Sequence, residues 1–374
     1  MIEPFKIEIS DERLADIRDR VARYDWSNLP DLGGWRSGVG KKDLRRLSDY
    51  WLTRFDWRAV EQRLNRLPHF ITEIDGTCIH FIHARGDGSK PPILLLHGWP
   101  GSFLEFEAFI EPLTSDGHDV VVPSLPGFAF SCANVAVGPR WAGQLFALLM
   151  HALFGPQRFI VHGGDWGAHI ASWMTFGQPD RLLGAHINMA YVHASDAAPT
   201  TPDEIAFATR CSEIFEWELG YNLEQETRPQ TLGAVLADSP VGVAAWILEK
   251  FGVWADLPKL SNGDPDVWSK FSEEFLLSNI MLYIGPSAVV TATWIYHGKR
   301  LERAGSFSAG TRIEVPLGVA AFPDPVFAPP PRSFLEKTYN VVHWTDMPSG
   351  GHFASLEEPR LMLSDIREFV GKIF

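Results

Sequence analysis

The chain has 374 residues, 45% hydrophobic and 21% charged, a composition typical of folded globular proteins that excludes an intrinsically disordered chain. Asp and Glu outnumber Lys and Arg by 46 to 33, and the net charge of −13 argues against a nucleic-acid partner. Cys78, Cys132 and Cys211 are far apart and form no CxxC pair, which disfavours both a disulfide framework and a thiolate metal site. We therefore expect reduced core cysteines in a cytoplasmic protein.

Residues 1–85 are predicted to form a mostly helical N-terminal domain. The first residues carry acidic side chains where a signal peptide needs a basic head and an apolar run, so no targeting segment is expected. Apolar residues at helical spacing predict amphipathic helices over 10–21 and 56–67. Residues 69–84 alternate around an Asp-Gly pair, which predicts two strands joined by a tight turn.

Residues 86–190 alternate short apolar runs with segments of helical periodicity. The apolar runs are predicted to be strands buried on both faces, and they lie at 92–96, 119–122, 159–161 and 186–189. Helices between consecutive buried strands predict a parallel sheet that is covered on both sides. This segment is therefore interpreted as the first part of an α/β core.

The core is predicted to resume near the end of the chain, after a helical insertion. Residues 191–304 show helical patterns rich in Trp and no strand pattern. Strand patterns return within residues 305–374, at 313–319 and 341–344, before a C-terminal helix with Pro359 in its first turn. A sheet that is interrupted and then resumed predicts a lid inserted into an α/β core. No apolar stretch is long enough to cross a membrane, so no membrane association is expected.

The strongest signal for chemistry is the segment 161–167, with the sequence Val-His-Gly-Gly-Asp-Trp-Gly. A predicted strand enters a glycine-flanked turn and a helix follows, which is the pattern of a nucleophile elbow, usually Gly-x-Ser-x-Gly, here with Asp165 in place of Ser. Glycines are needed because the sharp turn leaves no space for side chains on either side of the nucleophile. The alternative interpretation is that Asp165 only caps the following helix.

Two further segments favour a catalytic role for Asp165. His-Gly-Trp-Pro-Gly ends a core strand, and in α/β-hydrolases the loop after this strand supplies one oxyanion-hole amide while the residue after the nucleophile supplies the other. The predicted donors are the backbone N–H groups of Trp99 and Trp166. A Gly-Gly turn carrying His352 follows the final strand, where a triad in the order nucleophile, acid, histidine has its base. Alternatively, the first segment is only a turn and His352 is structural.

These segments resemble the epoxide hydrolases of the α/β-hydrolase fold, and most closely the microsomal and juvenile-hormone branch with its extra N-terminal domain. The resemblance covers nearly the whole chain. It rests on Phe55–Arg58, Asp75-Gly76, Ile79–Phe81, His97–Pro100, Gly164–Gly167, Asp238–Gly242, Glu249–Phe251 and Gly350–Phe353. It implies a cofactor-free enzyme that adds water to an apolar aryl or alkyl epoxide and forms a vicinal diol. No membrane anchor like that of the microsomal members is expected, so the chain resembles a soluble bacterial-type relative.

The resemblance also implies roles for individual side chains. Asp165 attacks an epoxide carbon, and a carboxylate needs no base for this step because it is ionised near neutrality. The ring opens to an alkyl ester, which a water molecule activated by His352 then hydrolyses. Two lid tyrosines assist the departing oxygen, and Tyr221 and Tyr296 match their positions. Tyr283 is the rival for the second tyrosine.

The triad acid of the family usually lies two residues after a Phe-Pro pair that follows a core strand. In this chain that position is Pro325, which has no carboxylate, and Asp324 lies one residue earlier in a proline-rich loop. A shift of one residue in such a loop is easily absorbed, so Asp324 is predicted to be the acid. Asp346, which is closer to His352 in sequence, is the alternative carboxylate.

The apolar lid pocket is predicted to include Trp246 and Trp294, together with Phe353 beside the catalytic histidine. The histidines form no spaced ligand set with carboxylates, so no metal is expected. The assembly is left open between a monomer and a homodimer. One rival function is a haloalkane dehalogenase, which also uses an Asp nucleophile but needs halide-holding donors in place of two tyrosines. The other is a non-catalytic hydrolase-fold protein that binds an apolar ligand under the lid.

Overall fold

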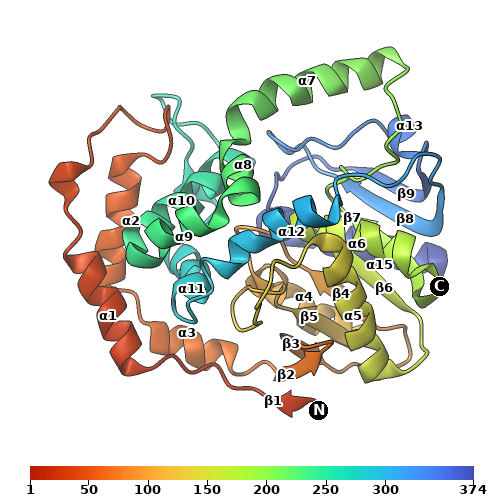
Figure 1. Cartoon of the computed structure of the whole chain (residues 1–374), viewed down its shortest axis with the longest axis horizontal. Helices are drawn as coiled ribbons and strands as arrows, with labels where there is room; N and C mark the ends of the chain where they lie inside the picture. The colour runs from red at the N-terminus through yellow and green to blue at the C-terminus, as the bar shows by residue number, and fades with distance from the viewer.

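A nine-stranded sheet with helices on both faces forms the centre of the computed structural model, which describes residues 1–374 (Figure 1). The strands follow the order β1-β2-β3-β5-β4-β6-β7-β8-β9 across the sheet. Neighbouring strands from β5 to β9 pair in parallel, and β1, β2 and β3 join through antiparallel pairs. Their bounds are Glu3–Pro4 (β1), His69–Ile74 (β2), Thr77–Ala84 (β3), Ile93–Leu96 (β4), Val120–Pro123 (β5), Phe159–Gly163 (β6), Leu182–Ile187 (β7), Ile313–Ala321 (β8) and Tyr339–Asp346 (β9).

The parallel strands are the apolar runs of the sequence, because strands covered on both faces have no polar side to alternate with. All four side chains of β4 are completely buried. The predicted strand at 186–189 is displaced, since β7 ends at Ile187. Asn188 turns out of the sheet towards the end of β6, where a Cβ at Gly164 would lie 2.7 Å from its Oδ1.

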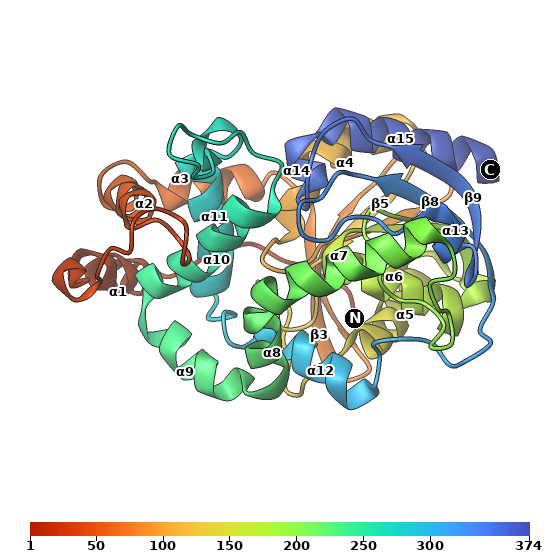
Figure 2. The same cartoon turned by 90° about the horizontal axis from the view of Figure 1, so that it is seen from above.

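Two pairs of helices cover the sheet, one pair on each face (Figure 2). On one face α5 (Pro139–Phe154) packs against α6 (Asp165–Gly177). On the other face α15 (Pro359–Ile373) packs against α4 (Glu107–Ser115) and the last three strands. Two short helices, α13 (Arg332–Leu335) and α14 (Ala354–Glu357), lie in the C-terminal part of the core. Together these elements form the layered α/β core that the sequence predicts.

The N-terminal segment divides between two parts of the molecule. Its helices are α1 (Asp11–Ala22), α2 (Lys41–Thr53) and α3 (Trp57–Leu64), and α1 and α2 pack against lid helices (Figure 1). Its hairpin turns at Asp75 and Gly76, which both have positive φ, and joins the core sheet through the pairing of β3 with β5. Residues 69–84, which lie within the predicted N-terminal domain (1–85), therefore extend the core sheet. Helix α2 was not predicted.

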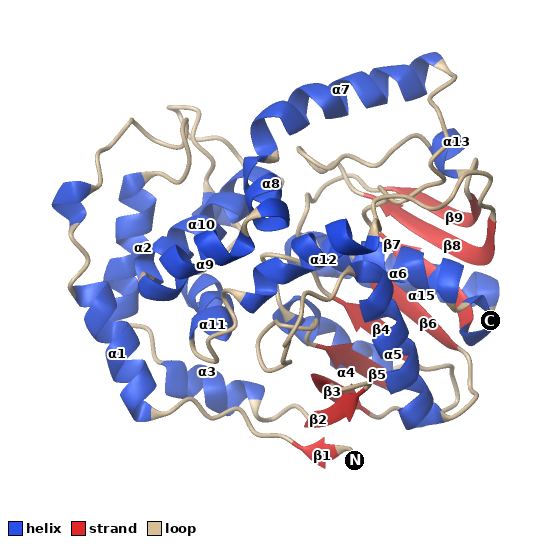
Figure 3. Cartoon of the chain, in the orientation of Figure 1, coloured by secondary structure: helices blue, strands red, loops and turns tan.

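The lid lies between β7 and β8, where the sequence places it, and is entirely helical apart from its loops (Figure 3). Its helices are α7 (Pro202–Glu218), α8 (Gly220–Thr227), α9 (Pro229–Asp238), α10 (Pro240–Trp254), α11 (Glu273–Ile284) and α12 (Trp294–Glu302). No single helix of the chain has the length and apolar character of a membrane span. The pair α9 and α10 reaches that length only together, with a bend of 117° between them.

The cysteines differ from the sequence prediction in their burial. Only Cys211 is buried, whereas Cys78 is half-buried and Cys132 is exposed. Cys78 and Cys132 are also neighbours in space, since the Cys132 N–H donates a hydrogen bond of 2.9 Å to the Cys78 carbonyl. The wide sequence spacing hid this pairing, because Cys132 lies in a loop that returns to β3.

A buried histidine–aspartate cluster links the sheet to α15. Asp365 of α15 accepts hydrogen bonds of 2.8 Å from Nε2 of His186 and from Nε2 of His343. His186 Nδ1 lies 2.9 Å from His162 Nδ1, and the Lys372 ammonium lies 2.6 Å from His343 Nδ1. We call these residues the structural cluster. Both ring nitrogens of His186 and of His343 and both oxygens of Asp365 have partners inside the cluster, so we assign it to packing and not to ion binding.

Candidate active site

The predicted nucleophile elbow is present at the junction of β6 and α6. Asp165 has a φ of 47°, in the left-handed region that strains most side chains. The flanking glycines are required by close backbone approach: a Cβ at Gly163 would lie 2.3 Å from the Gly167 carbonyl carbon, and one at Gly167 would lie 1.9 Å from the Leu96 oxygen. Asp165 is also the first residue of α6, where the helix dipole stabilises a negative charge.

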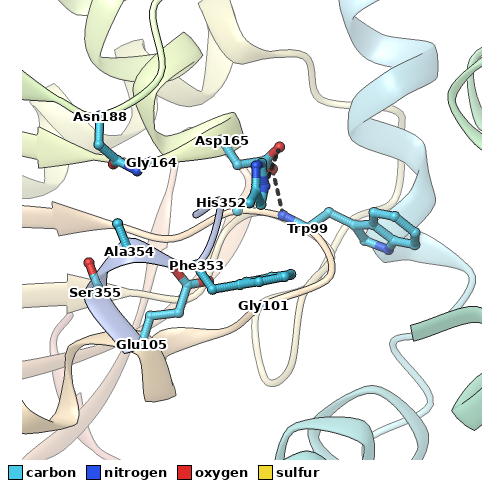
Figure 4. A pocket seen from close by; sticks show the side chains of 11 residues that line it. Trp99, Gly101, Glu105, Gly164, Asp165, Asn188, His352, Phe353, Ala354 and Ser355 are labelled. Atoms are coloured by element: carbon cyan, nitrogen blue, oxygen red, sulfur yellow. Dashed lines mark hydrogen bonds and ion pairs between the residues drawn. The ribbon is translucent and has the colours of Figure 1, made fainter. Parts of the chain in front are cut away.

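The loop after β4 holds one oxygen of this carboxylate. The Trp99 N–H donates a hydrogen bond of 2.7 Å to Asp165 Oδ1 (Figure 4). A Cβ at Gly98 would lie 2.2 Å from the same oxygen, so only glycine permits the approach. The amide of Trp166, the second predicted donor, lies in the first turn of α6, whose N–H groups have no partner within the helix. It makes no hydrogen bond to the carboxylate.

His352 lies between two carboxylates. Its Nδ1 is 3.0 Å from Asp324 Oδ2, and its Nε2 is 3.5 Å from Asp165 Oδ2 without forming a hydrogen bond. Asp324 is held in turn by the backbone N–H groups of Val326 and Phe327, which donate to Oδ1 at 2.8 Å and 2.7 Å. The structure thus places Asp324 where a triad acid is needed, and the residue shift is absorbed by the loop.

Asp346, the alternative acid, lies elsewhere. It is exposed at the end of β9, and its Oδ1 accepts a hydrogen bond of 2.9 Å from the Trp344 indole. Its proximity to His352 in sequence does not bring its carboxylate to the imidazole, because the strand and the Gly-Gly turn separate them.

The charge balance around His352 is unusual for a buried histidine. Burial lowers the pKa of His352, but the carboxylates of Asp165 and Asp324 outweigh this effect and raise the pKa to about 10. The imidazole is therefore a cation at neutral pH. The carboxylates of Asp165 and Asp324 on either side of the ring hold its proton in place.

Both predicted tyrosines project from lid helices towards Asp165. Tyr221 of α8 and Tyr296 of α12 line the same cavity as Asp165, and their rings are 5.8 Å apart. The Tyr296 hydroxyl is buried and has no hydrogen-bond partner. Burial raises the pKa of both phenols well above the ordinary value, and the Asp165 charge raises both further. Both phenols are therefore protonated donors. The rival Tyr283 instead donates to the Gly101 carbonyl at 2.5 Å.

The cavity has a volume of about 160 Å³ and a mostly hydrophobic wall. Besides Asp165, Trp166 and the two tyrosines, it is lined by Met189, Tyr191, Phe215, Leu219, Phe327, His169, Asn222 and Lys299. Sequence reasoning missed these eight residues. They come from five separate segments, and only the way the lid folds over the core brings them together.

The three residues predicted for the pocket do not line this cavity. Trp246 lines a separate hollow between α10 and the N-terminal segment, and its indole donates to Gln225 Oε1 at 3.0 Å. Trp294 lies half-buried at the start of α12. Phe353 stacks on Phe251 at 4.0 Å and borders a small hollow on the other side of Asp165 and His352. The sequence indicates apolar helices but not which face of each helix points inward.

Glu105 is a further residue that the sequence analysis missed. It borders the same small hollow as Asp165 and His352 (Figure 4). A Cβ at Gly101 would lie 1.7 Å from its Oε1, so the carboxylate fills the space that this glycine leaves. Burial, together with a smaller effect of the Asp165 charge, raises the pKa of Glu105 to about 8. The sequence did not single it out, because the apolar segment after Gly101 contains two acids, Glu105 and Glu107.

The sheet order, the inserted lid and the Asp–His–Asp constellation at an elbow define an α/β-hydrolase with a carboxylate nucleophile. Two family models match the N-terminal part of the chain, up to residue 210. Residues 2–106 match the family described as epoxide hydrolase N terminus, and residues 91–210 match the α/β hydrolase fold. The predicted resemblance is therefore confirmed.

Relatives of known name extend the match over the whole chain. The chain is 39% identical to a putative epoxide hydrolase of Stigmatella aurantiaca (98% of this chain, 84% of the relative) and 35% identical to epoxide hydrolase 1 of Oryctolagus cuniculus (100% and 89%). Among solved structures, the epoxide hydrolase of Aspergillus niger has a TM-score of 0.86 at 30% identity, covering 100% of this chain and 97% of that chain. The juvenile hormone epoxide hydrolase of Bombyx mori has a TM-score of 0.89 at 30% identity, covering 100% and 95%. The chain belongs to the epoxide hydrolase family, and it is an epoxide hydrolase.

Proposed function

We propose that this epoxide hydrolase converts compact apolar aryl or alkyl epoxides into vicinal diols through an alkyl ester on Asp165. One observation carries the proposal. A carboxylate stands at the elbow with Oδ1 held by the Trp99 amide at 2.7 Å, while its Oδ2 lies 3.5 Å from His352 beneath the two lid tyrosines. A seryl hydroxyl would need a base before it could attack, whereas a carboxylate is a nucleophile without one.

In the first step, Asp165 opens the epoxide ring. Because Oδ1 is engaged by Trp99, the attacking oxygen is Oδ2. A bond forms between Oδ2 and an epoxide carbon as the carbon–oxygen bond of the ring breaks. The departing oxygen needs a proton or strong hydrogen bonds, and Tyr221 and Tyr296 supply them as general acids. The unpartnered Tyr296 hydroxyl is the kind of donor that a substrate oxygen would satisfy.

In the second step, His352 drives hydrolysis of the ester. Esterification removes the negative charge of Asp165, so one of the two carboxylates that raise the pKa of His352 is lost. The imidazolium can then release its proton, which restores the phenol that donated to the epoxide oxygen, and the neutral Nε2 takes a proton from water. The resulting hydroxide attacks the Asp165 carboxyl carbon. The bond between that carbon and Oδ2 then breaks, and the diol leaves with Oδ2 and with the proton held by His352, so the carboxylate is restored with one oxygen from water. The Trp99 and Trp166 amides stabilise the oxyanion at Oδ1, and Asp324 orients the ring through Nδ1.

The cavity supports a compact apolar substrate. Its volume of about 160 Å³ and its aromatic and aliphatic wall favour a small aryl or alkyl group next to the epoxide. The comparisons favour neither of the two rival functions. A dehalogenase needs donors for a halide, whereas this site offers two phenols for an oxygen. A pure binding protein does not need a histidine held between two carboxylates.

The test uses racemic styrene oxide and the His352→Gln variant. We expect His352→Gln to open the ring but to hydrolyse the ester slowly, so intact-mass spectrometry should show protein heavier by the mass of the substrate. Asp165→Asn should gain no mass and form no diol. The exposed His151→Gln variant is the matched control and should turn over like the wild type. Absence of an adduct on His352→Gln, with substrate still bound, would exclude the ester mechanism.

We further propose that the protein works in the cytoplasm, without a membrane or nucleic acid, and that it forms a homodimer. Three free cysteines support a reducing compartment. Exposed apolar side chains on the lid support self-association, since Trp217 of α7 is 87% exposed and Leu223 of α8 is 59% exposed. Light scattering of the purified protein should give twice the chain mass, and Trp217→Glu should reduce it to one. A monomer at every concentration would contradict the dimer, and membrane-bound activity after cell fractionation would contradict the location.

A further inference from the structure

Lys250 is a buried cation in the lid, close to the catalytic residues but outside the cavity. Only 5% of the residue is exposed, although lysine is among the residues least often buried. Its ammonium forms an ion pair of 2.6 Å with Glu249, the preceding residue on α10. Burying a charge costs stability even when the charge has a partner, so packing alone does not explain why a lysine occupies position 250.

The ammonium of Lys250 lies against the ring of a lid tyrosine. Its Nζ is 4.4 Å from the centre of the Tyr221 ring and 5.3 Å from that of Trp254. The Tyr221 ring also stacks on Trp99 at 5.1 Å, with 10° between the planes. Trp254 in turn packs edge-on against His352 at 4.8 Å. Lys250 is therefore in direct contact with the aromatic groups that surround the reacting atoms.

The environment of Tyr221 otherwise opposes proton donation. Burial and the nearby charge of Asp165 raise the pKa of its phenol well above the ordinary value, and Glu249 acts in the same direction. A cation on the face of an aromatic ring is attracted by its π-electrons. That attraction grows as the phenol gives up its proton, because the ring then carries negative charge. An interaction that strengthens along the reaction lowers the barrier, whereas one that is constant does not.

We propose that Lys250 is a positioning residue for ring opening, which holds the ring of Tyr221 near Asp165 and strengthens its donation to the departing epoxide oxygen. Glu249 keeps the ammonium against the ring through the ion pair. The proposal rests on the function proposed for Tyr221. It predicts that Lys250 affects the first chemical step and not the second, because the tyrosines have no role in the attack of water on the ester.

The test separates the two steps by rapid mixing. Single-turnover reactions of styrene oxide with excess enzyme, quenched and followed by intact-mass spectrometry, give the rates of ester formation and decay. Lys250→Met keeps the length of the side chain and removes the charge. We expect it to slow ester formation about 3- to 30-fold and to leave ester decay unchanged. This factor is the change in rate constant that corresponds to the free energy of a cation–π contact. Lys250→Arg should restore most of the loss.

Two controls distinguish tuning of the phenol from a structural defect. Lys259→Met removes an exposed lysine of the following loop and should leave both rates unchanged. Glu249→Gln combined with Lys250→Met removes both charges of the ion pair and should behave like Lys250→Met alone. In a Tyr221→Phe background, with Tyr296 as the remaining acid, Lys250→Met should cause no further slowing.

The possible failures are distinguishable. Equal slowing of both steps, or slowing that persists in the Tyr221→Phe background, would show that Lys250 acts on packing and would overturn the proposal. Ester formation at the wild-type rate in Lys250→Met would also overturn it while leaving the ester mechanism intact. Absence of any ester in the His352→Gln variant would instead overturn the proposed function on which this inference rests.

Discussion

The protein contains two buried histidine–aspartate clusters, and they are built in opposite ways. In the structural cluster, Asp365 is shared by His186 and His343 and accepts a hydrogen bond of 2.8 Å from each. In the active site, one histidine has two carboxylate partners, because His352 lies between Asp165 and Asp324. Residue type is alike in the two places and the histidines of both are buried, so neither property identifies the catalytic one.

The difference appears in the protonation states. Burial lowers the pKa of His186 and keeps it neutral, and hydrogen bonds from its histidines overcome burial to lower the pKa of Asp365 to about 2. The pKa of His352 moves the other way, to about 10. In the structural cluster, the hydrogen bond between His186 and Asp365 satisfies both groups in these protonation states. In the catalytic cluster, the proposed esterification of Asp165 removes one of the two carboxylates that raise the pKa of His352, so the imidazole can lose its proton. A two-step reaction requires such a change in protonation.

The largest expected effect comes from removing the second carboxylate of the active site. Asp324→Asn should lower turnover by roughly two to four orders of magnitude and cause the ester to accumulate, because the imidazole loses its orienting acceptor. Asp346→Asn is the matched control and should leave turnover nearly unchanged. Steady-state diol formation and intact-mass spectrometry measure both effects. A large loss of turnover in Asp346→Asn, together with wild-type turnover in Asp324→Asn, would show that Asp346 is the triad acid.

The corresponding change in the structural cluster should affect stability and not chemistry. Asp365→Asn leaves one histidine donor without an acceptor and should lower the free energy of unfolding by about 2–4 kcal/mol. The rate constant per folded molecule should stay at the wild-type value. Urea unfolding, with activity measured in the folded baseline, tests both statements. A large loss of turnover with unchanged stability would mean that the two clusters do not differ as described.

The pH dependence of stability should distinguish the clusters further. Because the pKa of His352 is raised in the folded protein, its contribution is fully present below the unfolded pKa of about 6.5 and is lost as the pH rises through about 10. Between pH 7 and 9 the wild type should lose about 1 kcal/mol more per pH unit than His352→Gln. Parallel curves for the two proteins would show that His352 is neutral in the resting site.

The chemistry could be predicted from the sequence because it is encoded in short local patterns. Gly-flanked Asp165 and the Gly-Gly turn before His352 lie where strands end, and parallel strands bring their carboxyl ends to one edge of the sheet. Asp324 could be assigned by its order along the chain even though its loop is shifted by one residue. These positions needed no knowledge of how the lid packs.

What the sequence could not show depends on contacts between distant segments. The wall of the cavity combines residues such as Phe215 of the lid and Phe327 of the core, and Trp246, predicted to line the lid pocket, lines a different hollow. Likewise, local alternation predicted the hairpin but not its pairing with β5. The half-buried carboxyl of Glu105 and the buried ammonium of Lys250 look like surface groups in the sequence, because burial is a property of the fold.

The central claim is that Asp165 forms a covalent ester and that water attacks the carboxyl carbon of that ester. A single turnover of styrene oxide with excess enzyme in oxygen-18 water tests it most directly. We expect the diol of this first turnover to carry no solvent oxygen, because its new oxygen is Oδ2 of Asp165, and a peptide containing Asp165 should gain one oxygen-18. Solvent label in the first-turnover diol, with an unlabelled Asp165 peptide, would show that water attacks the epoxide directly and would contradict the account.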